Sequence, residues 1–220
     1  MTRCLHRPLP AHDRLKLLEL YTHRKDAKRV NNAALHRLPE ERVELRAGNT
    51  GQIFAANAWS YGADGEEGDF ARMTAAECRR EYFFKNLQTE TLLPLKKQAQ
   101  VMLLANIDVK QGLCNGARGV VQDFQRLTKN ELLLSAPGLG KSALSWFFEI
   151  NKNSDDQLLL PVVYFPTLNR SLLIVPYTWT QESTMWYRRR KKLTRVHVPL
   201  ALACKLAAFL AAFSRFADAD

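Results

Sequence analysis

The sequence predicts an α/β fold, in which an α/β segment reaches to about residue 90 and a smaller β-rich unit follows. Two observations predict this order. Residues 17–21 form a short apolar run that precedes a segment with helical periodicity, whereas after residue 99 the apolar runs are short and separated by turn residues. The 220 residues are 46% hydrophobic and 10% aromatic, which suffices to fill a core and excludes wholesale disorder, collagen-like repeats and a disulfide miniprotein.

The first part of the chain begins with a strand and a helix. Residues 17–21 are predicted to form a short buried strand. A helix is predicted over residues 24–38, because four apolar side chains recur near a period of 3.6 residues: Ala27, Val30, Ala34 and Leu38. Residues 48–69, which contain the acidic turn cluster YGADGEEGD, are expected to form a loop. Thr74-Ala-Ala-Glu77 has the spacing of a capping box, which predicts the start of a helix that runs to about Leu87.

The pattern then changes to strands. Residues 99–104 (AQVMLL) form a short apolar run, and residues 120–124 form another. Asn115-Gly116 lies between them and offers the positive φ angles that a tight hairpin turn needs. Further strands are predicted at residues 145–150, 158–165 and 172–175.

The positive charge of the chain is concentrated at its two ends. The net charge is +10; residues 1–46 carry eleven basic and six acidic side chains, and residues 184–220 carry eight and two. Two basic ends favour binding to a polyanion such as a nucleic acid, because Lys and Arg side chains that contact its phosphates release the counterions condensed on it. A solvated basic surface with a nuclear-import tract is the alternative.

Four cysteines lie far apart, without a C-x-x-C pair or a histidine spacing suited to zinc: Cys4, Cys78, Cys114 and Cys204. They are interpreted as buried or idle thiols of a reducing compartment, and no metal site is predicted. No secretory signal is expected, since the first twenty residues contain charged side chains and no apolar stretch. Residues 200–213 (LALACKLAAFLAAF) are apolar but too short to span a bilayer, which favours a buried or frayed helix over a membrane anchor.

Residues 135–142 (SAPGLGKS) nearly fit the phosphate-loop pattern G-x-x-x-x-G-K-[ST]. In that loop, glycines let backbone N–H groups wrap the phosphates and the lysine neutralises the outer ones. Here Ser135 stands in place of the first glycine, and residues 145–150 are bulky, aromatic and strand-like where a long helix should follow. We therefore interpret the segment as a glycine turn between two strands, and no other catalytic constellation is predicted.

Residues 92–124 carry an ordered set of features: Leu95-Lys96, residues 99–104 (AQVMLL), Asn106 and residues 112–119 (GLCNGARG). This stretch resembles petite-integration-frequency DNA helicases, and also Helitron helicases, where the second motor domain leads into its SH3-like subdomain. Two flanks agree. Residues 20–25 (LYTHRK) with Val30-Asn31-Asn32 resemble the fourth helicase motif, and residues 161–165 with residues 198–203 (VPLALA) resemble the approach to the fifth.

The resemblance implies a partial RecA-like second motor domain of a P-loop helicase, followed by a small SH3-like β-barrel subdomain. It divides the chain into a motor part (1–90), the β subdomain (91–182) and a basic linker with an altered apolar tail (183–220). It also implies a 5′-to-3′ DNA helicase that uses ATP and Mg²⁺ in DNA repair, recombination and telomere maintenance.

The chain departs from the family in two places. The phosphate-loop and magnesium-binding motifs would lie before residue 1, and residues 204–209 (CKLAAF) stand where the family has a histidine–lysine–serine–glutamine–glycine motif. We therefore expect a fragment that alone neither binds ATP or Mg²⁺ nor unwinds DNA.

Site residues are carried over from the same resemblance. Arg24 aligns with the motif-four arginine that reaches the terminal phosphate of the nucleotide; the alternative is an ordinary arginine at a helix start. A DNA-facing surface is expected to include Lys96, Lys97, Asn115 and Arg118, although Asn115 and Gly116 can also serve only the turn. A second basic tract, together with Arg195, is expected either to hold phosphates beside Trp186 and Tyr187 or to be a flexible loop: Arg188, Arg189, Arg190, Lys191 and Lys192.

The expected partner is single-stranded or forked DNA, with no membrane association. The expected location is the nucleus or a mitochondrion in a eukaryote, and otherwise the cell interior. Two alternatives stay open: a noncatalytic single-stranded DNA-binding module, and a decayed or wrongly assembled open reading frame.

Overall fold

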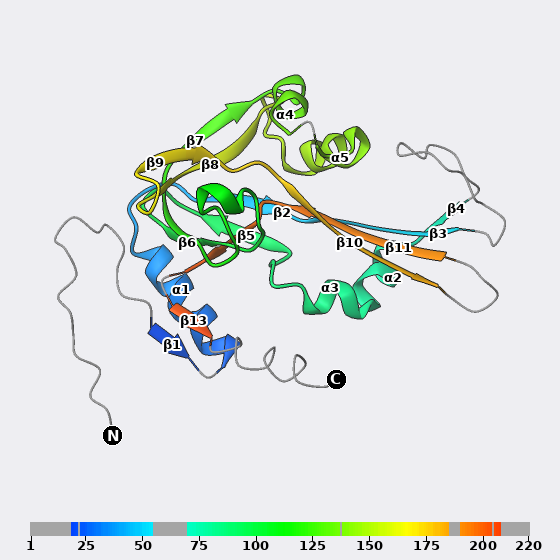
Figure 1. Cartoon of the computed structure of the whole chain (residues 1–220), viewed down its shortest axis with the longest axis horizontal. Coiled ribbons are helices and arrows are strands. Elements are labelled where there is room, and N and C mark those ends of the chain that lie inside the picture. The colour runs from blue at the N-terminus through cyan, green and yellow to red at the C-terminus, as the bar shows by residue number, and fades with distance from the viewer. Residues whose placement is uncertain are drawn as a thin grey trace.

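The computed structural model describes residues 19–21, 23–54, 70–136, 138–184, 190–203 and 205–207. In Figure 1, a long sheet extends to one side of a more compact body, and a small unit built on one helix lies at the other side of that body. In chain order the elements are β1 (Glu19–Tyr21), α1 (Arg24–His36), β2 (Val43–Arg46), β3 (Gly48–Phe54), β4 (Phe70–Arg72), α2 (Ala75–Arg80), α3 (Tyr82–Asn86), β5 (Leu92–Leu95), β6 (Gln100–Leu103), the 3-10 helix η1 (Val109–Gln111), β7 (Arg118–Leu127), α4 (Lys129–Ser135), α5 (Lys141–Asn151), β8 (Leu158–Phe165), β9 (Arg170–Leu173), β10 (Tyr177–Thr184), β11 (Arg190–His197), β12 (Leu200–Leu202) and β13 (Lys205–Ala207).

The body of the molecule contains a five-stranded antiparallel sheet in the order β12-β6-β7-β8-β9. The strands predicted over residues 99–104 and 158–165 are confirmed as β6 and β8, and the strand predicted over residues 172–175 corresponds to β9. The expected closed barrel is not seen among the described residues, because β12 and β9 form the two edges of the sheet and do not pair with each other. The fold class is therefore mixed α/β with an open sheet.

The connection between β6 and β7 is longer than the tight hairpin that Asn115-Gly116 predicted. It includes η1 and an isolated bridge between Asp108 and Leu113. The predicted turn is present within it: Ala117 N donates to Cys114 O at 2.9 Å, and Gly116 has φ +94°. A β-turn of this kind needs a positive φ only at its second central residue, which explains the glycine. Asn115-Gly116 therefore forms a turn at the end of this longer connection between β6 and β7.

The long sheet has the order β10-β11-β3-β4 and carries α2 and α3 on one side (Figure 1). The loop expected over residues 48–69 is wrong for its first part, because β3 pairs with β11; residues 55–69 lie outside the described residues. The glycines Gly48 and Gly51 of β3 are needed for close packing. A Cβ at Gly48 would collide with the Trp146 ring, and one at Gly51 would collide with the Met73 side chain.

The strand predicted over residues 145–150 is wrong, because this segment belongs to helix α5. Leu144, Phe147 and Phe148 are buried, and their i, i+3, i+4 spacing places them on one face of the helix. A short, bulky apolar run cannot be assigned to a strand or a buried helix from periodicity alone. Here the helical face completes the main core.

The single helix predicted from Thr74 to about Leu87 is divided into α2 and α3. The capping box is confirmed, since the Thr74 side chain accepts from Glu77 N and the Glu77 carboxylate accepts from Thr74 N at 2.7 Å. The break lies at Glu81, whose backbone is extended (φ −65°, ψ 131°). The Glu81 carboxylate contacts Lys191 Nζ of β11 at 2.8 Å, so the break coincides with a tether to the long sheet.

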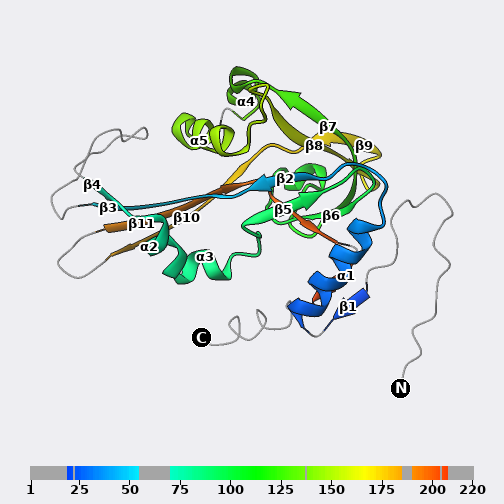
Figure 2. The same ribbon diagram turned by 180° about the vertical axis from the view of Figure 1, so that it is seen from behind.

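The small unit consists of α1 with β1 and β13, which pair in parallel beside it, as the two opposite views in Figures 1 and 2 show. The strand and helix predicted before residue 38 are confirmed as β1 and α1. The helix expected from residue 200 is wrong for the described residues: β12 pairs with β6 and β13 pairs with β1. Residue 204 and residues 208–213 of that run lie outside the described part.

Two clusters of buried side chains hold these parts together. The main cluster joins Leu35 of α1 to the five-stranded sheet, to α4 and α5, and to Val196 of β11. A smaller cluster joins Cys78 of α2 and Phe84 of α3 to Leu193 of β11. Cys78 and the half-buried Cys114 are free thiols, while Cys4 and Cys204 lie outside the described residues. Because the first cluster runs from α1 to β11, it fixes the walls of the groove described next.

Candidate nucleic-acid interface

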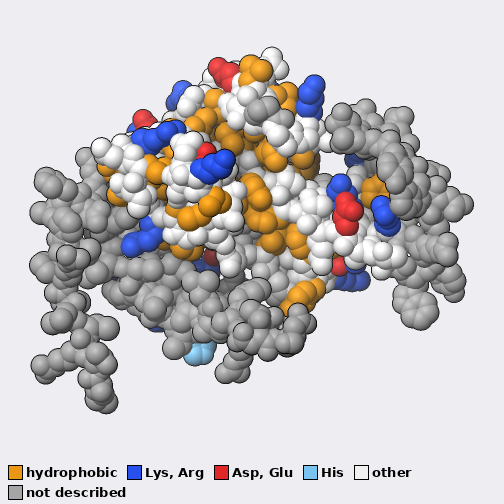
Figure 3. Space-filling view, in the orientation of Figure 1, with side chains coloured by type: hydrophobic (Ala, Val, Ile, Leu, Met, Phe, Trp, Pro, Cys, Tyr) orange, Lys and Arg blue, Asp and Glu red, His pale blue; other side chains and the backbone are white. Residues whose placement is uncertain are grey.

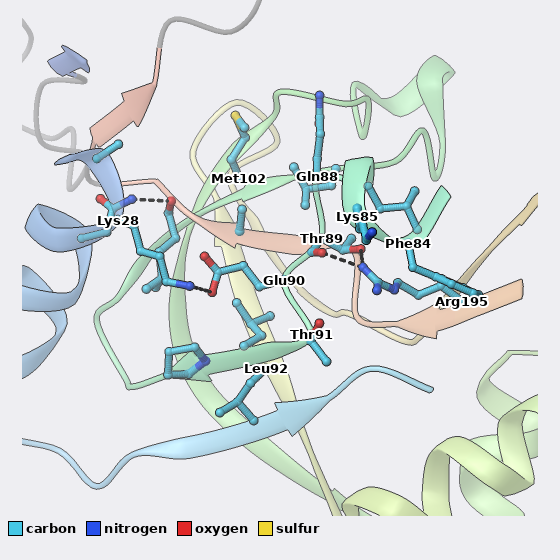
Figure 4. Close-up of a pocket in the computed structure, with 18 of the residues that line it drawn as sticks. Lys28, Phe84, Lys85, Gln88, Thr89, Glu90, Thr91, Leu92, Met102 and Arg195 are labelled. Atoms are coloured by element: carbon cyan, nitrogen blue, oxygen red, sulfur yellow. Dashed lines mark hydrogen bonds and ion pairs between the residues drawn. The ribbon is translucent and has the colours of Figure 1, made fainter. Parts of the chain in front are cut away.

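A groove of about 900 Å³ lies where α1, residues 87–94, the 115–116 turn, β12 and Arg195 of β11 meet (Figure 4). Its lining carries five basic side chains and one acidic side chain, so its local charge is strongly positive. The basic residues are Lys25, Lys28, Arg79, Lys85 and Arg195, and the acidic one is Glu90. Amide side chains that can donate and accept hydrogen bonds also line it: Asn31, Asn32, Asn49, Gln88 and Asn115.

One end of the groove is formed by α1. Lys28 Nζ contacts the Glu90 carboxylate at 3.0 Å, which links the helix to the segment before β5. Asn31 Nδ2 donates to Leu202 O of β12 at 3.1 Å. These two contacts, both drawn in Figure 4, position α1 against the sheet and offset one of the five positive charges.

The other end of the groove is built around Arg195, whose residue surface is only 2% exposed. Its Nε donates to Asn49 Oδ1 at 2.7 Å, and its Nη1 donates to Thr89 O at 2.9 Å and to Thr89 Oγ1 at 3.3 Å. The guanidinium carbon lies 5.5 Å from the centre of the Phe84 ring, a cation–π distance. Burial lowers the pKa of Arg195 from its usual value, because the charged form loses hydration.

The side chains of Arg79 and Lys85 are exposed at the rim of the groove. The capping box orients α2, which carries Arg79, and the buried Phe84 anchors α3, which carries Lys85. Phe83 packs edge-on against Phe84 at a centroid distance of 5.0 Å. The two rim cations therefore project from short helices that are fixed at their buried faces.

The DNA-facing set predicted from the sequence is only partly brought to this groove. Asn115 lines it, whereas Lys96 Nζ donates to Leu38 O at 2.7 Å. Lys97 pairs with Asp123 at 2.8 Å, and this contact raises the pKa of Lys97 and lowers that of Asp123. Arg118 Nη2 donates to Gln100 Oε1 at 3.2 Å. These three cations each have an intramolecular contact, and their role toward DNA stays a prediction.

The second predicted tract is a strand where it is described, because β11 begins at Arg190. Lys191 and Lys192 are consecutive residues of that strand and point to opposite faces of the sheet. Lys191 contacts Glu81, and Lys192 Nζ contacts the Glu182 carboxylate at 3.4 Å. Arg188 and Arg189, with Trp186 and Tyr187, lie outside the described residues, as does the side chain of Arg24, whose backbone starts α1.

Basic side chains are not gathered into one surface patch on the face shown in Figure 3. The described Lys and Arg side chains there lie at separate places on the surface, several of them beside Asp or Glu side chains. Lys28, Arg79 and Lys85 were not predicted, because their common position at the groove depends on packing between segments that lie far apart in the sequence. Arg195 was predicted only together with the basic tract that precedes it.

The phosphate-loop-like segment does not have the geometry that ATP and Mg²⁺ require. One sequence-based reason for rejecting it was wrong, since helix α5 does begin at Lys141. However, the segment follows helix α4, whereas a phosphate loop follows a strand. Glu149, the nearest acidic candidate, lies in α5 and pairs with Lys152 at 2.9 Å. In the described part of the chain, no group of three or more His, Cys, Asp and Glu side chains could hold a metal ion.

The part of the chain that the structure describes contains no helix long and apolar enough to cross a membrane.

Comparison with known proteins identifies relatives of this chain. The sequence family described as "DNA helicase Pif1, 2B domain" matches residues 84–124. The ATP-dependent DNA helicase PIF1 of Danio rerio is 71% identical over 34 residues, which are 16% of this chain and 5% of that protein. The ATP-dependent DNA helicase PIF1 of Xenopus laevis is 32% identical over 118 residues, which are 54% of this chain and 15% of that protein.

The crystal structure of the Pif1 helicase from Candida albicans shares the fold of the described chain. It superimposes with a TM-score of 0.59 at 22% sequence identity, covering 91% of this chain and 38% of that one. The chain thus corresponds to a minor part of each of these relatives. The family predicted from residues 92–124 is confirmed: the chain matches part of the Pif1 family of DNA helicases, and that part includes the 2B domain.

Proposed function

We propose that this chain is the DNA-binding part of a Pif1-type helicase and that it holds single-stranded DNA in the groove. The observation that carries the proposal is the lining of that groove, in which five cations face one carboxylate. Phosphates of a single strand attract such a lining without any sequence preference. In this proposal, the unit around α1 is the partial RecA-like second motor domain, and the β-rich part is its SH3-like subdomain.

Hydrogen-bonding groups in the groove support a nucleic-acid ligand over a simple anion. The amides of Asn32, Asn49 and Asn115 come from three different elements or turns. Each can donate to a phosphate or a sugar and can accept from a base edge. The groove therefore offers contacts along the length of a strand.

The activity of the longer helicase is part of the proposal. The two vertebrate relatives are named as ATP-dependent DNA helicases, and the chain covers 5% and 15% of them. We propose that the chain serves such an enzyme, with ATP and Mg²⁺ bound by other parts, in 5′-to-3′ movement on single-stranded or forked DNA. Its roles would be repair, recombination and telomere maintenance, in the nucleus or a mitochondrion of a eukaryote.

A noncatalytic DNA-binding module is the second candidate function. It is favoured by the charge of the groove, because a lining with five cations can bind phosphates without ATP hydrolysis. This function can be tested on the chain alone. A cooperative thermal melt of the purified chain would contradict the third possibility, a decayed reading frame whose product does not fold.

Fluorescence anisotropy with a labelled oligothymidine, measured across a salt series, tests the groove. The double variant Arg79→Gln/Lys85→Gln removes two exposed rim cations. We expect it to reduce the magnitude of the slope of log K against log salt by about 1.4 and to weaken binding at 50 mM salt at least tenfold. Circular dichroism checks that the variant is folded.

The matched control is Arg126→Gln/Lys141→Gln, which removes the same two charges from exposed positions outside the groove. It should change the slope far less than the groove variant. Equal losses in the two double variants would show a diffuse charge effect and would refute the groove. Absence of any binding by the unmodified chain at 50 mM salt would refute DNA binding by the chain itself.

A further inference from the structure

Arg195 differs from the other cations of the groove in that it is almost completely buried. Its three hydrogen bonds to described residues go to neutral acceptors, the Asn49 amide oxygen and two oxygens of Thr89. Among the described residues, no carboxylate lies within 4.0 Å of its guanidinium. The positive charge of Arg195 is thus oriented by dipoles and a ring face but is not neutralised.

Burial of a charge without a counter-charge is costly, because hydration is lost and no ion pair replaces it. The chain satisfies this rule elsewhere: the half-buried Lys191 lies against Glu81, and Lys28 at the opposite end of the groove lies against Glu90. Arg195 is the one fully buried Lys or Arg among the described residues, and it lines a groove open to solutes. A bound anion would supply the missing charge.

The contacts of Arg195 leave one side of the guanidinium for such an anion. Nε and Nη1 are held by Asn49 and Thr89, whereas Nη2 makes no hydrogen bond to the described residues and is not enclosed. The Asn49 amide accepts from Arg195 through its oxygen, so its NH₂ group can donate to the same anion. Figure 4 shows Arg195 with Thr89, Phe84 and Lys85 at one end of the groove.

We infer that Arg195 is a phosphate-binding residue and that it forms, with the Asn49 amide, an inner phosphate subsite of the groove. Guanidinium groups donate strong hydrogen bonds to phosphate oxygens, and the donors that the subsite offers are the N–H groups of Arg195 Nη2 and the NH₂ group of Asn49. Lys85 at the rim adds a second positive charge, which strengthens the attraction of the subsite for an anion. The inference rests on the proposed function, since the phosphate is expected to be an internucleotide phosphate of single-stranded DNA.

Two variants test the subsite by oligothymidine anisotropy. Arg195→Lys keeps the charge but removes the planar fork, and it should weaken binding at least tenfold with nearly the same salt slope. Arg195→Gln removes the charge as well, and it should also reduce the magnitude of the slope by about 0.7. Lys141→Gln is the control for a lost charge away from the groove. Folded Arg195 variants with wild-type affinity and slope would overturn the inference.

A measurement on the unmodified chain covers the case in which a variant at this buried position does not fold. The Nε–Hε resonance of Arg195, assigned through its side-chain connectivity, should shift and saturate on addition of oligothymidine. Methylphosphonate oligothymidine, whose backbone is uncharged, should leave it unchanged. Inorganic phosphate and ATP are tested in parallel; a shift with these but not with oligothymidine would assign the subsite to a free phosphate. No shift with any phosphate would overturn the subsite.

The two proposals fail in distinguishable ways. If oligothymidine binds and Arg79→Gln/Lys85→Gln weakens it while Arg195 shows no response, the groove function stands and the inner subsite is refuted. If the unmodified chain binds no oligothymidine, the groove function itself is refuted.

Discussion

His197 lies two residues after Arg195 and is completely buried. Neither ring nitrogen has a hydrogen-bond partner among the described residues, and the ring packs 6.3 Å from that of Phe147. Burial, and in second place the charge of Arg195, lower the pKa of His197 to about 3. The imidazole is therefore a neutral part of the core at physiological pH, and protonation of this ring opposes folding.

We predict that this histidine makes the protein less stable in mild acid. Between the unfolded pKa of about 6.5 and the folded value near 3, only the unfolded state takes up the proton, so stability falls as pH falls. The free energy of unfolding should decrease by about 2 kcal/mol from pH 7.5 to pH 5, as measured by urea denaturation. His197→Leu should remove this part of the pH dependence, whereas the exposed His36→Gln should not. An unchanged pH dependence in His197→Leu would contradict the assignment.

At the residue scale, the sequence predicts which kinds of side chain serve a site better than it predicts which residues those side chains contact. Asn115 was predicted from the family pattern and does line the groove. Lys97 was predicted from the same pattern, but it contacts Asp123. Asp123 lies in β7, which is brought close to Lys97 by the pairing of β7 with β6. The environment of Arg195 depends on Asn49 and Thr89, which lie more than a hundred residues away in the chain. No local pattern signals a contact of that kind.

At the scale of elements, one ion pair adds to the apolar contact between α2–α3 and the long sheet. Glu81 and Lys191 have side chains that are only 22% and 20% exposed, and they join the helix break to β11. Such a pair lies between exposed ion pairs, which contribute up to about 1 kcal/mol, and buried ones, whose disruption costs about 3–5 kcal/mol. The tether therefore contributes measurably to stability.

We predict that Glu81→Gln lowers the free energy of unfolding by about 2 kcal/mol, because Lys191 is left partly buried without its counter-charge. Chemical denaturation measures the change. Glu182→Gln is the matched control, since Glu182 contacts the adjacent Lys192 at 3.4 Å in an exposed position and should cost less than about 0.5 kcal/mol. Equal effects of the two substitutions would show that burial of the Glu81 pair is not important.

Element types were predictable where a strong signal was local. The 3.6-residue period gave α1, and the capping box gave the start of α2. Residues 145–150 were assigned to a strand because their aromatic side chains suit a sheet, but tertiary packing of Phe147 and Phe148 favours α5. Residues 48–54 were assigned to a loop together with the acidic turn cluster that follows them, but they form β3, in which Gly48 and Gly51 pack closely against Trp146 and Met73. Neither neighbour can be foreseen from the local sequence.

At the scale of the whole molecule, the order of the fold was predictable from the change in apolar pattern near residue 90, and the family from residues 92–124. The open form of the five-stranded sheet was not predictable. Closure into a barrel depends on whether the two edge strands pair with each other, and β12 and β9 do not pair. The groove was also unpredictable as a unit. Its walls come from α1, the segment after α3, β11 and β12, which only the packed core brings together.

We predict that the chain alone has no ATP turnover above background, with or without single-stranded DNA. The lysine of the loop-like segment, Lys141, begins a helix that follows another helix, so the phosphate-binding arrangement after a strand is missing. A phosphate-release assay measures turnover. Turnover that is abolished by Lys141→Ala but retained by Lys110→Ala, an exposed lysine on η1, would contradict this prediction.

The pairing of β1 with β13 joins residues 19–21 to residues 205–207. During synthesis on a ribosome, β1 therefore emerges first and stays without its partner until almost the entire described chain has been made. The pairing of β3 with β11 imposes a similar delay on the long sheet. Because closing long loops is entropically unfavourable and slow, the antiparallel strands from β6 to β9 can assemble during translation, while the sheets that connect distant segments close last.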